Sequence, residues 1–343
     1  MKFQKLGKSG IEVSRFCYGA WGVGGGNVWS DMQFDSSDVE KLLDAASDLG
    51  VNYIDTAPVY GVGASEIVLG QALKNGGRRD KFILQTKCSL NWRGEGKGEF
   101  EYERDGKTVC RDLTKDSIIK DVEDSLERLQ TDHIDVLVVH RARSIKIDTP
   151  VAETADALNT LKQQGKIRAA GISNSSAEDL KEYLKYTDIA LVQEKYSVVN
   201  SKNLTAYVPT CNELGVIFQP YGNLEEGAVC GPAYYEKELA PTDIRSFSPL
   251  RKEPLRSMML QAFKDLEPMC AKHNCSVTNL FQAYMIDKIP NVSLLTGFRR
   301  IETLTNSMEA LDVVLDADEI AVIDAFSKNI NAKMAEVMAA AKK

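Results

Sequence analysis

Short apolar runs rich in β-branched residues alternate along the chain with longer stretches in which apolar residues recur every three or four positions. The short runs are typical of buried strands, and the longer stretches are typical of helices that cover one face of a sheet. The predicted strands are residues 14–18, 53–55, 82–86, 135–139, 169–172, 191–193, 216–219 and 292–295. The predicted helices between them are residues 38–49, 66–73, 118–129, 151–164, 177–186 and 203–214.

Eight strand-then-helix units predict an α/β protein whose parallel sheet closes into a (β/α)8 TIM barrel. An open, doubly wound sheet is the alternative, which eight units without a central break disfavour. The opening FQKLGKSGIEVS predicts an N-terminal β-hairpin that turns at Lys8-Ser9-Gly10, and residues 318–340 predict an extra C-terminal helix rich in alanine. No linker divides the 343 residues, so residues 1–343 are predicted to form one domain.

Two connections, residues 89–112 and 222–252, are too long to be simple turns. The first contains FEYERDGKTVC, in which apolar residues alternate on either side of Asp105-Gly106, a strong signal for a two-residue hairpin. Both connections follow predicted barrel strands and therefore belong to the carboxyl face, where active sites of this fold are built. They are candidate lids, and plain surface insertions are the alternative.

Four polar residues stand at or just after the ends of predicted strands. Asp55 closes NYID and Tyr60 follows five residues later among glycines, while Lys87 and His140 end FILQTK and DVLVVH. Each alone has an ordinary structural explanation: packing for a tyrosine, helix capping for an aspartate, a buried structural role for a single histidine. Because the carboxyl ends of barrel strands meet at one face, their joint occurrence predicts a catalytic group.

The composition narrows the classes of function. A net charge of −7 disfavours a surface that binds nucleic-acid phosphates. Gly7-Lys8-Ser9 and the glycines at 22–26 lack the spacing of a phosphate loop or a dinucleotide-binding fingerprint. With three histidines and no H-E-x-x-H motif, no metal site is predicted.

The same residues predict a cytoplasmic protein without a membrane partner. No apolar run approaches the roughly 20 residues that cross a bilayer, and the first residues do not resemble a secretion signal. Seven cysteines without a C-x-x-C pair are typical of a reducing compartment.

The chain resembles the aldo-keto reductase superfamily over nearly its whole length, and most of all bacterial reductases of the methylglyoxal and sugar-carbonyl type. The resemblance rests on NYIDTAPVYGVGASEIVLGQAL at 52–73, the strand-end Lys87 and His140, GKIRAAGISN at 165–174 and LVQEKYS at 191–197. It implies hydride transfer between a nicotinamide cofactor, NADP or NAD, and a small aldehyde, ketone or sugar carbonyl.

The resemblance assigns a role to each of the four polar residues. Tyr60 is the general acid and base, and the Lys87 ammonium is expected to lower the pKa of Tyr60 from its ordinary value near 10. Asp55 is expected to fix and partly neutralise Lys87. His140 is expected to orient the carbonyl oxygen and to stabilise charge that develops on it.

For the cofactor, the resemblance places Ser173, Asn174 and Gln193 at the nicotinamide carboxamide and Tyr221 against the nicotinamide ring. The remaining residues predicted to bind the cofactor are Gly19, Ala20, Trp21, Asp55, Gly222, Leu224, Glu226, Gly297, Arg299, Arg300, Thr303, Asn306 and Ser307.

Two departures from the family pattern affect the cofactor prediction. Glu225 and Glu226 follow Leu224 along the predicted pyrophosphate site, where two inward carboxylates would be unfavourable, so at least one is expected to face solvent. Arg299 or Arg300 at a helix start could hold a 2′-phosphate, and two solvated surface arginines are the alternative. The choice between NADP and NAD therefore stays open.

The predicted substrate pocket is aromatic with basic neighbours. Its predicted contacts are Trp21, Trp29, Tyr60, Trp92, His140 and Arg141, with the hairpin at 100–110 as a further wall. Such walls suit a small hydroxylated aldehyde or a sugar. Two other functions remain open: a cofactor-binding regulatory subunit with slow turnover, and a sugar dehydrogenase that works mainly in the oxidative direction.

Overall fold

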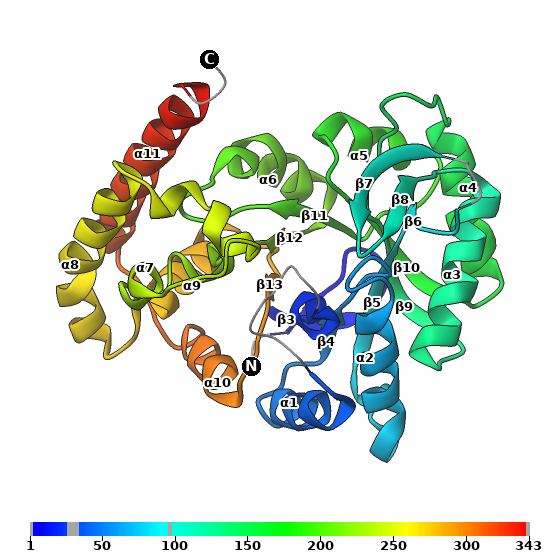
Figure 1. Ribbon diagram of the computed structural model, residues 1–343, viewed down its shortest axis with the longest axis horizontal. Helices are drawn as coiled ribbons and strands as arrows, with labels where there is room; N and C mark the ends of the chain where they lie inside the picture. Colours follow the sequence, from blue (N-terminus) through cyan, green and yellow to red (C-terminus); the bar gives the residue numbers. More distant parts are fainter. Residues whose placement is uncertain (1–2, 26–33, 95–97, 341–343) are drawn as a thin grey trace.

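The structure, a computed structural model, describes residues 3–25, 34–94 and 98–340. Eight strands form one parallel sheet in the order β12-β11-β10-β9-β5-β4-β3-β13. They are β3 (Phe16–Gly19), β4 (Tyr53–Asp55), β5 (Ile83–Cys88), β9 (Ile134–Val139), β10 (Ile167–Ser173), β11 (Leu191–Lys195), β12 (Ile217–Tyr221) and β13 (Leu294–Thr296). Phe218 of β12 bridges Val292, just before β13, and so closes the sheet. The predicted (β/α)8 barrel is confirmed (Figure 1).

Six helices, one after each of the first six barrel strands, pack around the outside of the barrel (Figure 1). They are α1 (Ser36–Asp48), α2 (Ala64–Lys74), α3 (Lys115–Leu129), α4 (Val151–Gln163), α5 (Ala177–Tyr183) and α6 (Lys202–Leu214). Local capping sets their starts: the Asp35 side chain accepts from the backbone N–H of Asp38, and Ser176 forms a capping box with Asp179. All six were predicted, with ends that differ by at most three residues.

The C-terminal third adds helices that the sequence pattern only partly predicts. They are α7 (Ala233–Glu236), α8 (Leu255–His273), α9 (Val277–Lys288), α10 (Ile301–Glu309) and α11 (Ala317–Ala340). Helix α11 is the predicted tail helix. The connection at 222–252 contains α7 and three 3-10 turns: η4 (Glu225–Gly227), η5 (Ile244–Phe247) and η6 (Pro249–Arg251).

The N-terminal hairpin closes the amino end of the barrel, and its prediction is confirmed. Strands β1 (Phe3–Lys5) and β2 (Glu12–Ser14) pair antiparallel. Leu6, Ile11 and Val13 are buried against residues near the starts of the barrel strands, such as Cys17 and Tyr53. The hairpin therefore supplies apolar side chains to the bottom of the barrel interior.

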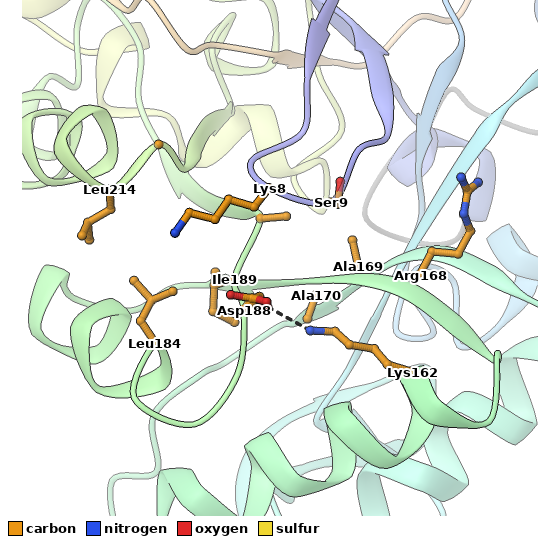
Figure 2. Close-up of a pocket in the computed structure, with 12 residues that line it drawn as sticks. Lys8, Ser9, Lys162, Arg168, Ala169, Ala170, Leu184, Asp188, Ile189 and Leu214 are labelled. Carbon is orange, nitrogen blue, oxygen red and sulfur yellow. Dashed lines mark hydrogen bonds between the residues drawn. The ribbon is translucent and has the colours of Figure 1, made fainter.

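A cavity of about 140 Å³ lies at this amino end, between the hairpin turn and strands β10 and β11 (Figure 2). Its charged lining is largely paired, because Lys162 Nζ donates to the backbone oxygen of Asp188 at 3.0 Å and Arg168 pairs with Asp135. The cavity is at the opposite end of the barrel from the polar residues that end the strands, so it is no part of the candidate site.

A small second sheet stands beside the carboxyl end of the barrel. Strands β6 (Leu90–Asn91), β7 (Glu99–Arg104) and β8 (Lys107–Arg111) form it in the order β6-β8-β7. Asp105 and Gly106 connect β7 to β8 with φ of 48° and 71°, as a two-residue hairpin of this type requires. The predicted hairpin is confirmed, and it lies over the side of the barrel that carries β5 and β9 (Figure 1).

Candidate active site

The loop after β4 places Tyr60 at the carboxyl mouth of the barrel. The loop turns at once, since the Tyr60 N–H donates to Ala57 O at 3.1 Å and the Ser65 N–H donates to Tyr60 O at 3.1 Å. The 3-10 turn η1 (Ala20–Gly24) packs directly on this loop. A Cβ at Gly24 would lie 2.7 Å from the Tyr60 carbonyl carbon, and one at Gly61 would lie 2.1 Å from Gly24 O. Glycine at both positions therefore lets the two backbones touch and hold Tyr60.

Asp55, Tyr60 and Lys87 meet at one point. Lys87 Nζ donates to both carboxylate oxygens of Asp55, at 2.6 and 2.7 Å, and to Thr56 O at 2.9 Å. The same nitrogen donates to Tyr60 Oη at 3.2 Å. Lys87 and Asp55 are almost fully buried, with 0% and 1% of their side chains exposed. A buried charge needs such a partner, and here the Asp55 carboxylate balances the Lys87 ammonium beside the phenol.

The pKa of Tyr60 differs from the sequence-based expectation. Burial, followed by the Asp55 carboxylate, raises the pKa of Tyr60 well above its ordinary value. The predicted lowering by Lys87 is wrong for this arrangement, because the Lys87 charge is paired with Asp55 at 2.6 Å and gives the phenol no net positive neighbour. Tyr60 therefore holds its proton near neutral pH.

His140 faces Tyr60 from the end of β9. The two rings are 6.1 Å apart and nearly perpendicular, at 88°. Burial, together with the charges of Lys87 and Arg141, lowers the pKa of His140 well below its ordinary value, so the imidazole is neutral. Among the described residues its buried Nδ1 has no hydrogen-bond partner. The site thus presents a protonated phenol and a neutral imidazole to the same space.

A layer of glutamines lies beneath these residues, and the sequence analysis missed two of them. Gln85 Nε2 donates to Asp55 Oδ1 at 2.6 Å and to Gln219 Oε1 at 2.8 Å, and Tyr53 Oη donates to Gln85 Oε1. Gln193 Nε2 donates to the same Asp55 and Gln219 oxygens, at 3.1 and 2.8 Å. The spacing held a signal: Gln85 lies two residues before Lys87, and alternate residues of a strand face the same side.

Three of the four residues predicted at the nicotinamide share one hydrogen-bonded cluster. Asn174 Nδ2 donates to His140 O at 2.8 Å and to Ser173 Oγ at 3.1 Å, while Tyr221 Oη donates to Asn174 Oδ1 at 2.7 Å. Ser173 Oγ in turn donates to the backbone oxygen of Gln193 at 2.7 Å. Three neighbouring strand ends, those of β10, β11 and β12, therefore bring hydroxyl and amide groups together beside His140.

The two glutamates after β12 differ in their exposure. Glu225 is buried, accepts from Ser197 Oγ at 2.7 Å and pairs with Lys195 at 3.1 Å. Glu226 is half-buried, and burial raises the pKa of Glu226. Glu225 is thus turned inward, where Lys195 supplies the charge that makes its burial acceptable, and Glu226 is the more exposed of the two.

The predicted contacts around β13 and α10 separate into two groups. Gly297, Arg300 and Thr303 are exposed at the start of α10, and Arg299 beside them is half-buried. Asn306 and Ser307 instead hydrogen-bond residues of α9. Of the remaining predicted contacts, Gly19, Ala20 and Trp21 continue from β3 into η1, and Gly222 and Leu224 follow β12.

Two of the predicted pocket tryptophans lie near Tyr60. The Trp21 ring is 6.1 Å from the Tyr60 ring, and Trp92 packs in the same small apolar cluster as Tyr60 and Tyr102. Trp29 lies outside the described residues. Arg141 follows His140 directly, with its Nε 3.0 Å from Glu101 of the hairpin.

Two further features of the described residues bear on function. They contain no group of three or more His, Cys, Asp or Glu side chains that could hold a metal ion. None of the helices that they form is long and apolar enough to cross a membrane.

Comparison with known proteins gives one consistent family. The profile of the aldo/keto reductase family matches residues 15–328. The NADH-specific methylglyoxal reductase of Escherichia coli (strain K12) is 32% identical over 319 residues, which cover 93% of this chain and 96% of that protein. The aldo-keto reductase YhdN of Bacillus subtilis (strain 168) is 29% identical over 96% of this chain and 94% of its own. Among solved structures, a glycerol dehydrogenase from Gluconobacter oxydans superposes with a TM-score of 0.80 at 29% identity, covering 92% of each chain.

Proposed function

This chain belongs to the aldo/keto reductase family, and from that premise we propose that it reduces a small aldehyde or ketone with Tyr60 as the general acid. The family is one of oxidoreductases that use NADPH or NADH and act on carbonyl compounds. The observation that carries the proposal is the convergence of four chain segments, in which Lys87 contacts both Asp55 and Tyr60 while His140 faces the same phenol.

The residues of the chain fit a nicotinamide cofactor. A carboxamide needs both hydrogen-bond donors and acceptors, and Ser173, Asn174 and Gln193 offer hydroxyl and amide groups of both kinds on two adjacent strands, β10 and β11. Tyr221 closes this cluster and offers an aromatic face. When bound, the cofactor supplies the hydride.

The remaining work falls to Tyr60, His140 and Lys87. The neutral His140 imidazole donates a hydrogen bond that orients the carbonyl oxygen, and Tyr60 Oη delivers a proton to that oxygen as it gains charge. Lys87 donates a hydrogen bond to Tyr60 Oη at 3.2 Å and so fixes the position of the phenol oxygen, while Asp55 holds Lys87 in place.

The protonation of Tyr60 agrees with its role as the general acid. Since burial raises the pKa of Tyr60, the resting phenol is a proton donor, which reduction requires. The same oxygen accepts a proton when the reaction runs in reverse, and one similar solved structure is that of a glycerol dehydrogenase. A sugar dehydrogenase that works mainly in the oxidative direction is therefore the second candidate, which assays of alcohols with oxidised cofactor against aldehydes with reduced cofactor separate from the first.

Whether the chain prefers NADPH, which carries a 2′-phosphate, or NADH depends on the residues at the start of α10. The relative from Escherichia coli is named as NADH-specific, which makes NADH the first cofactor to test. Arg300, exposed at the N-cap of α10, is the residue that would bind the additional phosphate of NADPH.

The test is cofactor oxidation by the purified protein with methylglyoxal, with NADH and NADPH in parallel. Tyr60→Phe is expected to lower kcat by about 100-fold or more, the usual contribution of a general acid, while cofactor binding measured by fluorescence is retained. Tyr186→Phe, at a half-exposed tyrosine on the surface, is the matched control and leaves kcat unchanged. A wild type that binds cofactor but is no faster than Tyr60→Phe with any carbonyl would contradict the proposal and favour a regulatory, cofactor-binding role.

A further inference from the structure

We propose that the substrate carries an anionic group, a carboxylate or a phosphate, which Arg104 of the β7–β8 hairpin binds together with Arg141. The inference rests on the proposed function, since it concerns the substrate of the same site. Its basis is the position of the hairpin and the pairing of the charged groups at the mouth of the barrel.

The hairpin brings Arg104 to the catalytic residues. Tyr102 of β7 packs in one apolar cluster with Tyr60, around Ala57 and Val59 of the loop that carries Tyr60. The guanidinium of Arg104 lies over the ring of Tyr102, 4.9 Å from its centre. Tyr102 thus links the arginine to the residues that pack around Tyr60.

At the carboxyl mouth of the barrel, the Arg104 guanidinium differs from the neighbouring basic groups because no carboxylate of the described residues pairs with it. Lys87 is paired with Asp55, and Arg141 is paired with Glu101. Within the described part of the chain, the Arg104 side chain has no carboxylate partner and no hydrogen bond, and its guanidinium lies over the Tyr102 ring. In a chain with a net charge of −7, a half-buried, unpaired guanidinium beside the active site calls for a ligand anion.

Arg141 adds a second guanidinium to the same place. It follows His140, and its backbone N–H donates to Ser89 Oγ at 3.2 Å, which fixes it at the end of β9. Nε faces Glu101, and the two terminal nitrogens have no hydrogen bond to any described residue. They remain available to an anion that Arg104 also contacts.

The electrostatics agree with this placement. The charges of Arg141 and Arg104 both contribute to lowering the pKa of His140, after burial and Lys87, and Arg104 opposes the rise in the pKa of Tyr60. Both guanidiniums are therefore felt where the carbonyl would lie.

Hydrogen bonds attach the base of the hairpin to the segment that follows β9. Arg111 of β8 donates to Arg143 O at 2.5 Å, and Glu99 of β7 accepts from the backbone N–H groups of Ile145 and Ile147 at 2.9 and 2.5 Å. The base of the hairpin is therefore tied to the segment that follows Arg141, while Arg104 stands at the other end of β7, beside the turn. Two guanidiniums that can both reach one anion suit a carboxylate or a phosphate.

The test compares aldehydes that differ in charge. The carboxylate pair is 4-formylbenzoate and its methyl ester, and the phosphate pair is glyceraldehyde 3-phosphate and glyceraldehyde. The wild type is expected to prefer the anion in at least one pair, with a preference that weakens as salt is added. Arg104→Gln is expected to lower kcat/KM for the anion by about 10- to 100-fold and to change that of the neutral partner little.

Matched variants separate recognition from general effects. Lys107→Gln removes the same charge from an exposed position on the same hairpin and is expected to keep the preference. Arg104→Lys keeps the positive charge and is expected to retain part of the preference for the anion. Unfolding curves confirm that each variant folds.

Each outcome decides between the two proposals. If neutral aldehydes are reduced but neither anion is preferred, or if Arg104→Gln lowers both members of a pair equally, the inference is overturned and the reductase stands. If no aldehyde of any charge is reduced with NADH or NADPH, the proposed function fails, and the inference fails with it. The pair that shows the preference identifies the anion as carboxylate or phosphate.

Discussion

Asp55 is held from below by Gln85, a contact that makes this glutamine a positioning residue for Lys87. Gln85 is fully buried and donates to Asp55 Oδ1 at 2.6 Å. A hydrogen bond to a charged group is worth about 1.5–3 kcal/mol, so Gln85→Met is expected to lower kcat by about tenfold or more. Steady-state reduction of methylglyoxal at saturating cofactor measures this change in kcat.

Gln85→Glu distinguishes positioning from simple structural support. A second carboxylate beside Asp55 raises the pKa values of the pair, so this variant is expected to lose activity as the pH falls below neutral, where the wild type does not. If both Gln85 variants are merely less stable and keep the wild-type pH profile, the glutamine supports the fold and does not position Asp55.

The sequence revealed the residues at strand ends more readily than those inside the barrel. Asp55, Lys87 and His140 follow apolar runs, and the closed barrel brings them together with Tyr60 as expected. Gln85 and Gln219 were missed because each is a single polar residue within a strand. Their contact depends on the closure of the sheet, which brings residues 134 positions apart to 2.8 Å. The pKa of Tyr60 depends on burial and on the pairing of Lys87, neither of which a sequence specifies.

At the scale of single elements, the β7–β8 hairpin is attached to the barrel mainly through Glu99. Burial alone would raise the pKa of Glu99, but hydrogen bonds from Ser144 and from the N–H groups of Ile147, Lys146 and Ile145 lower it to about 2. The pKa in the unfolded chain is near 4.3, so the attachment stabilises the fold fully above about pH 5. This stabilisation is lost as the pH falls towards 2.

Glu99→Gln is therefore expected to lower the Tm by roughly 2–4 °C at pH 7, with a difference from wild type that shrinks at pH 3. Hydrogen exchange of residues 98–111 is expected to quicken in the variant at neutral pH. Glu103→Gln, at an exposed position of the same hairpin, serves as the control. An equal loss of Tm at both pH values would show that the charge of Glu99 is not what holds the hairpin.

Elements with a strong periodic pattern were predicted well, and buried ones were not. The six helices after the first six barrel strands carry an apolar stripe, which the sequence displays. Helix α9 has no polar stripe, since eight consecutive residues from Thr278 to Met285 are buried. The Asp105-Gly106 turn was predictable because local backbone geometry alone favours it.

At the scale of the whole molecule, the barrel separates stability from chemistry between its two ends. The alternation of strands and helices was enough to predict closure, because eight parallel strands covered by helices have few other ways to bury both faces. Contacts between distant segments determine the order in which the strands pair and the bridge between Phe218 and Val292 that closes the sheet. They also determine how the β7–β8 hairpin is attached to the barrel. The sequence pattern does not encode these locally.

The N-terminal hairpin tests this separation, because its side chains fill the barrel at the end away from Tyr60. Leu6 is fully buried there, so Leu6→Ala is expected to lower the free energy of unfolding by about 2–5 kcal/mol through lost burial and an unfilled cavity. Phe3→Ala, at a side chain that is 45% exposed on the same hairpin, is expected to change it by less than about 1 kcal/mol. Urea unfolding measures both changes in the free energy of unfolding.

The kcat of Leu6→Ala for methylglyoxal is expected to stay within about twofold of wild type. The N-terminal hairpin contacts neither Lys87 nor Tyr60, and a pure loss of packing leaves the transition state unchanged. A large fall in kcat with the fold intact would mean that the two ends of the barrel are coupled through the glutamine layer that lies between them.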